Sequence, residues 1–167
     1  MYNLGITLPK VLETSLLPNH PRIVVLKAHL EHISAMKVIA DGYRDQIGFI
    51  PRAKFQETVD AERVIVALVD GSVVGFVVYR HRKTDEQTTL SEICVSKQWQ
   101  KQGIGKLLVQ ALEAECRAKL RCWIQLKCPV DLPANYFYEK LGFFLIATEP
   151  GKKRSLNVWR LHVMQGT

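Results

Sequence analysis

The fold is decided by the stretch Gln100-Lys101-Gln102-Gly103-Ile104-Gly105-Lys106. It follows an apolar, strand-like run that ends at Val95. Apolar residues then recur three and four positions apart, at Ile104, Leu107, Leu108, Ala111 and Leu112. This spacing predicts an amphipathic helix that begins inside the stretch and ends near Leu120. A strand, a glycine-containing turn and a helix are therefore expected in that order.

Two glycines at the start of a helix favour a phosphate-binding turn. Glycine lets ligand atoms approach the backbone closely, and the N–H groups of a helix's first turn have no partner within the helix. The helix dipole favours negative charge there, and Lys101 and Lys106 add positive charge. The Rossmann pattern is absent because Leu108 stands where its third glycine would be, and the Walker pattern is absent too. The turn is predicted to hold a phosphate or pyrophosphate, although a bare G-x-G also fits a plain helix start.

The rest of the chain alternates between strand and helix patterns. Asp70-Gly71 separates two β-branched apolar runs, which is typical of a type I′ hairpin. A helix over 133–141 has Asp131 as its predicted N-cap and Gly142 as its C′ residue. The other predicted elements are strands over 23–26, 63–69, 72–82, 88–95, 123–126, 143–147 and 156–163, and helices over 30–43 and 52–61. We therefore expect one mixed α/β domain over 22–167, after an N-terminal extension over 1–21 that lacks sustained periodicity.

Length, net charge and cysteine spacing limit the classes of partner that the chain is expected to bind. The chain has 167 residues, which suits a single domain, and 23 Lys and Arg against 16 Asp and Glu give a formal charge of +7. That excess favours an anionic partner such as a phosphorylated cofactor, nucleic acid or an acidic protein surface, or else serves solubility alone. No run of about 18 apolar residues exists, so no membrane span is predicted. The four cysteines form no C-x-x-C pair, so no metal site is predicted, and the lack of an export signal predicts a cytoplasmic protein.

Two motifs resemble those of the GCN5-related N-acetyltransferase (GNAT) superfamily. Gln100, Gly103 and Gly105 match the acyl-CoA signature Q/R-x-x-G-x-G/A residue by residue. The segment over 134–143 resembles the second family pattern, A-x-x-F-Y-x-x-x-G-F. The resemblance covers about 22–163. It implies a GNAT-like α/β fold, in which a central, mostly antiparallel sheet is splayed at the acyl-CoA site and flanked by helices.

The resemblance implies acetyl-CoA as co-substrate and transfer of its acetyl group to a primary amine, which attacks the thioester directly. Asn often stands three residues before Ala134 in the family, where this chain has Asp131, and Asn135 is predicted to make that cofactor contact instead. The N–H of Val95 is expected to polarise the thioester carbonyl. The other implied cofactor-binding residues are Ile93, Cys94, Gln100, Lys101, Gln102, Gly103, Ile104, Gly105 and Lys106.

Direct attack requires two proton transfers. An alkyl amine with a pKa of about 10.4 is almost fully protonated at pH 7, so a base is expected, acting directly or through water. Glu92 on the predicted strand is the candidate base, and an ordinary solvated or salt-bridged carboxylate is the alternative for it. Tyr138 matches the family tyrosine that gives a proton to the leaving thiolate. Its alternative is a core aromatic beside Phe137, Phe143 and Phe144.

The charge of two loops is the only feature of the sequence that limits the class of acceptor. The loops over 46–52 and 149–154, which shape the acceptor site in this family, carry cations and argue against a polyamine or an aminoglycoside. An acidic small molecule, a protein tail near acidic residues or an aminoacyl-tRNA is compatible with them. Two alternative functions stay open: a catalytically idle acyl-CoA-binding regulatory module, and a nucleic-acid-directed protein, either a plain binder or an acetyltransferase acting on aminoacyl-tRNA. The family resemblance also suggests a homodimer.

Overall fold

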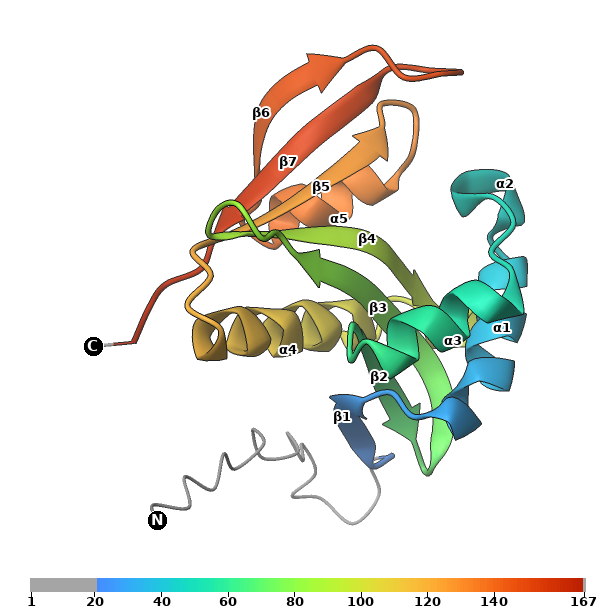
Figure 1. The fold of residues 1–167 in the computed structure, drawn as a ribbon. Coiled ribbons are helices and arrows are strands. Elements are labelled where there is room, and N and C mark those ends of the chain that lie inside the picture. Colours follow the sequence, from blue (N-terminus) through green and yellow to red (C-terminus); the bar gives the residue numbers. More distant parts are fainter. Residues whose placement is uncertain (1–20, 167) are drawn as a thin grey trace, which may run out of the picture.

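The predicted strands join into one open seven-stranded sheet in the order β1-β2-β3-β4-β5-β7-β6 (Figure 1). The computed structural model describes residues 21–166, so the predicted extension over 1–21 lies outside the described residues except for Pro21. The strands are β1 Ile23–Lys27, β2 Val64–Val69, β3 Ser72–His81, β4 Gln87–Val95, β5 Trp123–Pro129, β6 Phe144–Glu149 and β7 Leu156–His162. The helices are α1 Ile33–Asp41, α2 Arg44–Ile47, α3 Arg52–Asp60, α4 Ile104–Ala118 and α5 Ala134–Lys140, with 3-10 turns η1 Leu30–His32 and η2 Lys97–Trp99.

The hairpin between β2 and β3 turns where the sequence predicts it. Asp70 and Gly71 have φ angles of 48° and 84°, and a type I′ turn requires a positive φ at both central residues. Every strand pairing in the sheet is antiparallel except that of β4 with β5, which is parallel. The predicted mixed α/β fold with a mostly antiparallel sheet is confirmed.

β4 and β5 pair over only three residues of each strand. The register joins Gln87, Thr88 and Thr89 of β4 to the first three residues of β5. Beyond Thr89 the two strands separate, while β4 stays paired with β3 as far as Val95. The edge of β4 that faces β5 is therefore left without a strand partner over its second half, which is the splay that the family resemblance implies.

Two hydrophobic cores lie on opposite faces of the sheet. α4 and α5 cover one face, where Leu108 and Leu112 are fully buried against the strands. α1 and α3 cover the other face over β2, β3 and β4, where Met36 and Phe76 are fully buried. No residue of β5, β6 or β7 is part of this second core. The second face is therefore packed by helices only on the β1–β4 side of the gap.

The helices differ from the sequence prediction in two details and agree with it in a third. The predicted N-cap of α5 is wrong: Pro133 takes that place without a side-chain cap, because the Asp131 carboxylate instead accepts a hydrogen bond from Arg154 at 2.8 Å. Gly142 follows α5 with a φ of 90° and is the C′ residue, as predicted. The helix predicted over 30–43 is divided into η1 and α1, and Tyr43 leaves the helical conformation with a φ of −118°.

The described residues contain no feature of a membrane span or a metal cluster. Within 21–166 no helix is long and apolar enough to cross a membrane. The same part of the chain holds no group of three His, Cys, Asp or Glu side chains arranged to share a metal ion. The four cysteines are free thiols, and three of them are buried.

A buried charge cluster at the far end of α4 leads to a stability prediction. Glu115 is 8% exposed and lies 3.0 Å from Lys27 Nζ and 3.6 Å from His81 Nε2. Polar contact with His81, and then with Lys27, lowers the pKa of Glu115 to about 2. Since the folded pKa is below the unfolded one, the carboxylate stabilises the fold at neutral pH, and this contribution is lost as pH falls from about 4.5 toward 2.

We expect Glu115→Gln to lower the free energy of unfolding at pH 7 by about 2 kcal/mol, because Lys27 keeps its partly buried charge with only the neutral oxygens of Glu62 and Tyr79 as partners. Urea unfolding at pH 7 and pH 3 measures the effect, and the difference from wild type should shrink at pH 3. Glu113→Gln is the control, since Glu113 on the same helix meets Arg117 only at 3.9 Å. A deficit that is equal at both pH values would contradict the assignment.

Candidate functional site

The turn before α4 is open at Gly103. This residue is the N-cap of α4 with a φ of 82°, a left-handed conformation that strains any residue with a side chain. A Cβ placed on Gly103 would meet no atom within 4 Å. No side chain caps the helix at this end. The unpaired N–H groups of the first turn of α4 are therefore available to an anion.

Gly105 has a different reason to be glycine. A Cβ on Gly105 would lie 2.9 Å from the ring of Phe137, which belongs to α5. Real Cβ atoms essentially never approach so closely, so the absence of a side chain lets α5 pack against the start of α4. The expectation that both glycines leave room for a ligand therefore holds for Gly103, whereas the room at Gly105 is filled by Phe137.

The other predicted residues of the turn are divided between the core and the surface. Ile104 is 1% exposed and belongs to the core beneath α4. The side chain of Gln102 donates to the carbonyl of Gln98 at 3.3 Å, and that of Gln100 donates to the hydroxyl of Tyr43. Lys101 and Lys106 are both exposed, and no described residue forms an ion pair with either of them. Both lysine charges are therefore free to meet an anion at the turn.

The free edge of β4 presents backbone groups to the gap. Ser96 N donates to Val74 O at 2.7 Å, which makes these two residues a hydrogen-bonded pair between β3 and β4. Antiparallel pairs alternate, so the next pair, Gly75 with Val95, is not hydrogen-bonded, and the N–H and C=O of Val95 point toward β5. The same alternation directs the backbone groups of Ile93 to the gap.

Cys94 lies between those two residues and behaves differently. By the same alternation its backbone groups pair with Phe76 of β3 and point away from the gap. Its side chain is buried in the core under α1 and α3, and burial raises the pKa of the Cys94 thiol to about 12. Of the three strand residues predicted to bind the cofactor, Ile93 and Val95 face the gap and Cys94 does not.

Tyr138 lies beneath the gap, on the α4 and α5 side of the sheet. It is 7% exposed and packs between Phe137 and Phe143. Burial raises the pKa of its phenol far above the ordinary value, and the electrostatic influence of Cys128 on β5 and Cys94 on β4 adds to this. The hydroxyl forms no hydrogen bond with any residue of the described part of the chain. Tyr138 is therefore a neutral phenol, close to β4 and β5, whose hydroxyl has no partner among the described residues.

Glu92 lies on the opposite face of the sheet. It pairs with Val78, whose side chain belongs to the core under α1 and α3. Together with Lys54 and Arg80 it lines a cavity of about 210 Å³. Burial raises the pKa of its carboxyl, against a smaller opposing effect of Lys54. The Glu92 carboxylate makes no hydrogen bond or ion pair with any other described residue, so it is not salt-bridged, and a solvated strand carboxylate stays the alternative to a base.

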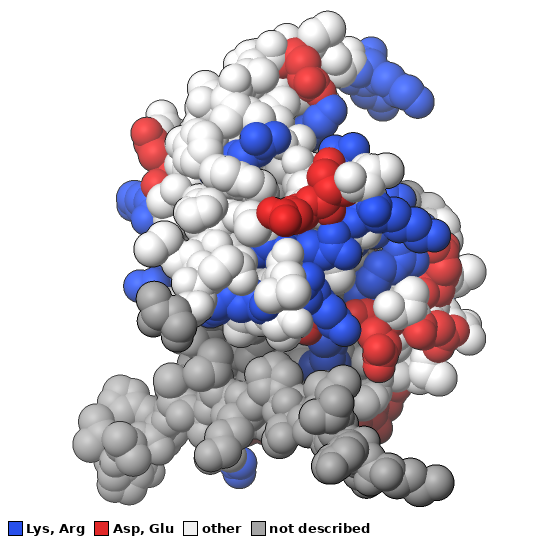
Figure 2. Space-filling view, turned by 60° about the vertical axis from the view of Figure 1, so that its left-hand side comes forward, with Lys and Arg blue, Asp and Glu red and all other residues white. Residues whose placement is uncertain are grey.

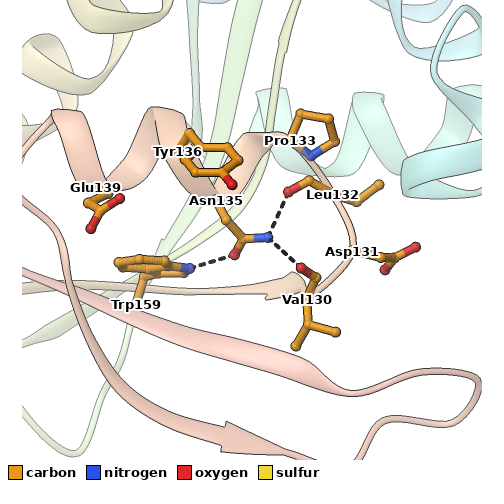
Figure 3. Close-up of a pocket in the computed structure, with 8 residues that line it drawn as sticks. All are labelled: Val130, Asp131, Leu132, Pro133, Asn135, Tyr136, Glu139 and Trp159. Carbon is orange, nitrogen blue, oxygen red and sulfur yellow. Dashed lines mark hydrogen bonds between the residues drawn. The ribbon is translucent and has the colours of Figure 1, made fainter.

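Asn135 is engaged within the chain (Figure 3). Its amide nitrogen donates to the carbonyl oxygens of Leu132 at 2.7 Å and Pro129 at 2.9 Å. Its amide oxygen accepts hydrogen bonds from Trp159 Nε1 at 2.8 Å and Asn157 at 3.1 Å. It thereby joins the loop after β5 to β7, at a cavity of about 370 Å³ that Figure 3 shows around it. Because both ends of the Asn135 amide are bonded within the chain, this arrangement does not support the predicted contact with the cofactor.

Tyr43 is a residue at the site that the sequence does not reveal. Its hydroxyl donates to the carbonyl oxygen of Val95 at 2.5 Å and accepts from the side chain of Gln100. In the sequence it appears only as one of several apolar positions at helical spacing. The sole indication available there is its polar tip, because a partly buried tyrosine hydroxyl usually finds a partner.

Comparisons with known proteins agree with this geometry. A family model described as "Acetyltransferase (GNAT) domain" matches residues 60–144. Ard1 from Thermoplasma volcanium is 21% identical with a TM-score of 0.77, over 86% of this chain and 99% of that one. The ribosomal-protein-S18-alanine N-acetyltransferase from Escherichia coli is 18% identical with a TM-score of 0.70, over 87% and 96%.

A third solved structure carries a ligand. The putative acetyltransferase yncA from Salmonella typhimurium, solved with its cofactor acetyl-CoA, is 17% identical with a TM-score of 0.72, over 86% of this chain and 95% of that one. A comparison with curated proteins finds no match. At these identities the solved structures show the fold, whereas the family model spans half of the chain and includes the turn and α5. The chain belongs to the GNAT acetyltransferase family.

Proposed function

We propose that this acetyltransferase moves an acetyl group from acetyl-CoA to a primary amine that attacks the thioester directly. One observation carries the proposal: the open, uncapped turn at Gly103 stands next to a strand edge that has lost its partner. A diphosphate needs the first of these features and an extended amide-containing chain needs the second. The residues present therefore suit coenzyme A.

Each part of the cofactor has protein groups of matching chemistry. The N–H groups of the first turn of α4, with Lys101 and Lys106, are assigned to the diphosphate. The backbone groups of Ile93 are assigned to the pantetheine arm and the N–H of Val95 to the thioester carbonyl, since Val95 O already accepts from Tyr43. Acetyl-CoA supplies the activated acetyl group. Cys94 and Asn135 are omitted from this assignment because their polar groups are used inside the protein.

Glu92 and Tyr138 are assigned to the two proton transfers. Glu92 accepts a proton from the acceptor's ammonium, directly or through water, which leaves a neutral amine to attack. The N–C bond then forms and the C–S bond breaks, and the nitrogen loses a second proton to solvent, which replaces the one that Tyr138 gives to sulfur. Tyr138 donates its proton to the leaving sulfur, which yields free coenzyme A and an amide. The two side chains approach the gap from opposite faces of the sheet, so the acceptor is assigned to the face of Glu92.

The acceptor class is set partly by charge. In the β6–β7 loop Arg154 is paired with Asp131, and Glu149 with Lys127, which leaves Lys152 and Lys153 as exposed cations. On the face shown in Figure 2, Lys and Arg side chains are interspersed with Asp and Glu. The occurrence of both signs of charge together does not favour binding of a nucleic acid backbone on that face. The nucleic-acid partner, the homodimer and the cytoplasmic location stay predictions.

Calorimetry with acetyl-CoA and free-thiol release against a panel of amines test the proposal. The panel contains small amines, lysine peptides and peptides with free N-terminal α-amines, which need a base least because their pKa is lower. We expect binding of acetyl-CoA and thiol release with at least one acceptor class. Binding without thiol release for any amine would favour the idle regulatory module, and absence of binding would overturn the proposal.

Gly103→Ala is expected to raise the Kd for coenzyme A more than tenfold, because the added methyl group enters the open space above the turn. Gly71→Ala is a matched control: its φ is 84°, and a Cβ there also meets no atom within 4 Å, but it lies in the β2–β3 hairpin. Each substitution should cost about 1–2 kcal/mol of folding stability through its left-handed conformation. Equal coenzyme A affinities in both variants would argue against a ligand at the turn.

A further inference from the structure

Tyr43 connects two parts of the proposed acyl-CoA site that are distant from it in sequence. It lies between α1 and α2 and is partly buried against the core under those helices. Its hydroxyl donates to Val95 O at 2.5 Å, at the end of β4, and accepts from the side-chain amide of Gln100. One hydroxyl therefore contacts both the free strand edge and the first residue of the signature turn.

Each of these two bonds gives a polar group a partner that neighbouring residues do not supply. Val95 O points toward the gap, where β5 has already separated, so no strand N–H is available to it. Gln100 is in an extended conformation, with φ −67° and ψ 158°, between η2 and the start of α4. Ser96 N ties the peptide that follows Val95 to Val74 O on one side only. Without the Tyr43 hydroxyl, Val95 O on the other side would lose its partner and the side chain of Gln100 would be free to reorient.

The consequence concerns the two groups assigned to coenzyme A. The N–H of Val95 and the N–H groups behind Gly103 must keep a defined separation to hold the thioester arm and the diphosphate of one ligand. Ordering them before the ligand arrives reduces the entropy lost on binding. A single hydroxyl bonded at both places would restrict this separation.

We propose that Tyr43 is a positioning residue that orders the strand edge and the turn for acyl-CoA. It acts through Val95 and Gln100 and is assigned no contact with the reacting atoms. This inference rests on the proposed function, since it concerns the same ligand. It adds a residue from the connection between α1 and α2 that neither motif of the sequence contains.

Tyr43→Phe removes the hydroxyl and keeps the ring. We expect the Kd for coenzyme A, measured by calorimetry at a temperature where both proteins are folded, to rise about tenfold, because two hydrogen bonds are lost. Tyr136→Phe is the matched control, since Tyr136 is 71% exposed on α5 and no described residue bonds its hydroxyl. The control should leave the Kd unchanged within twofold.

A double-mutant cycle separates positioning from a purely structural role. If Tyr43 acts through Gln100, Tyr43→Phe combined with Gln100→Ala should weaken binding by less than the product of the two single effects. Amide NMR signals of Ser96 and Gly103 should shift in the ligand-free Tyr43→Phe protein. A lower melting temperature with an unchanged Kd, or fully multiplicative effects in the cycle, would overturn the inference. Absence of coenzyme A binding by the wild-type protein would instead count against the proposed function.

Discussion

Glu92→Gln is expected to lower kcat about 100-fold while leaving the Kd for coenzyme A unchanged, because general-base catalysis typically contributes this much. Glutamine keeps the shape of the side chain but cannot take the proton that the acceptor's ammonium must lose before it attacks. Burial raises the pKa of Glu92, and the carboxylate is the active form. The wild-type rate should therefore fall as pH decreases through a value above the ordinary carboxyl pKa of about 4.3, and Glu92→Gln should lose that acidic limb.

Stability measurements make the Glu92 result specific. A carboxyl whose pKa is raised by burial destabilises the folded protein at neutral pH, so the variant should melt at the same temperature as wild type or higher. Glu113→Gln is the matched control, because burial also raises the pKa of Glu113, which lies on α4. A Glu92→Gln enzyme with wild-type kcat and an unaltered acidic limb would exclude Glu92 as the base.

Tyr138→Phe is the second large effect, with an expected loss in kcat of about 100-fold and no change in the Kd for coenzyme A. The phenol lies beneath the gap, on the α4 and α5 side of the sheet, and its raised pKa keeps it protonated at every working pH. Without its proton the thiolate must leave as an anion or find water in a buried place. The loss should shrink with an acyl donor whose leaving thiol has a lower pKa, because such a thiolate needs less assistance.

The alternative of a core aromatic makes a different prediction for Tyr138. Phenylalanine preserves the packing between Phe137 and Phe143, so a purely structural residue would tolerate the substitution with little effect on either kcat or melting temperature. Tyr136→Phe on the same helix controls for the chemical change at an exposed position. Wild-type turnover by Tyr138→Phe, with intact coenzyme A binding, would assign the tyrosine to the core.

Local sequence predicted the elements that depend on residues close together in the chain. The Asp70-Gly71 turn adopts the positive φ angles that its residue types favour, and α4 follows the spacing of its apolar residues. The open Gly103 turn belongs to the same class, because a strand end, a left-handed glycine and a helix start are all determined within about ten residues. Two motifs with this context were enough to predict the family.

The hydrogen-bond partners of Asp131 and Asn135 depend on contacts between segments that are distant in the sequence. The cap predicted for Asp131 was lost to Arg154, and the amide of Asn135 was taken by Trp159 and Asn157, each more than 20 residues away. Residue types at these positions are compatible with several partners, and only the packing of α5 on β7 selects one. The assignment of Asn135 to the cofactor could not anticipate this competition.

The chain's own sequence therefore determined the turn that suits a diphosphate, since backbone conformation there follows from glycine and helix periodicity alone. Three features became known from the folded structure alone: β4 and β5 separate after Thr89, Cys94 faces β3 while Val95 faces the gap, and Tyr43 contacts Val95, 52 residues away. These features depend on strand register and on side chains meeting from separate elements. Periodicity predicts which face of a strand is buried. It does not predict where the pairing with a neighbouring strand stops and leaves backbone groups unpaired.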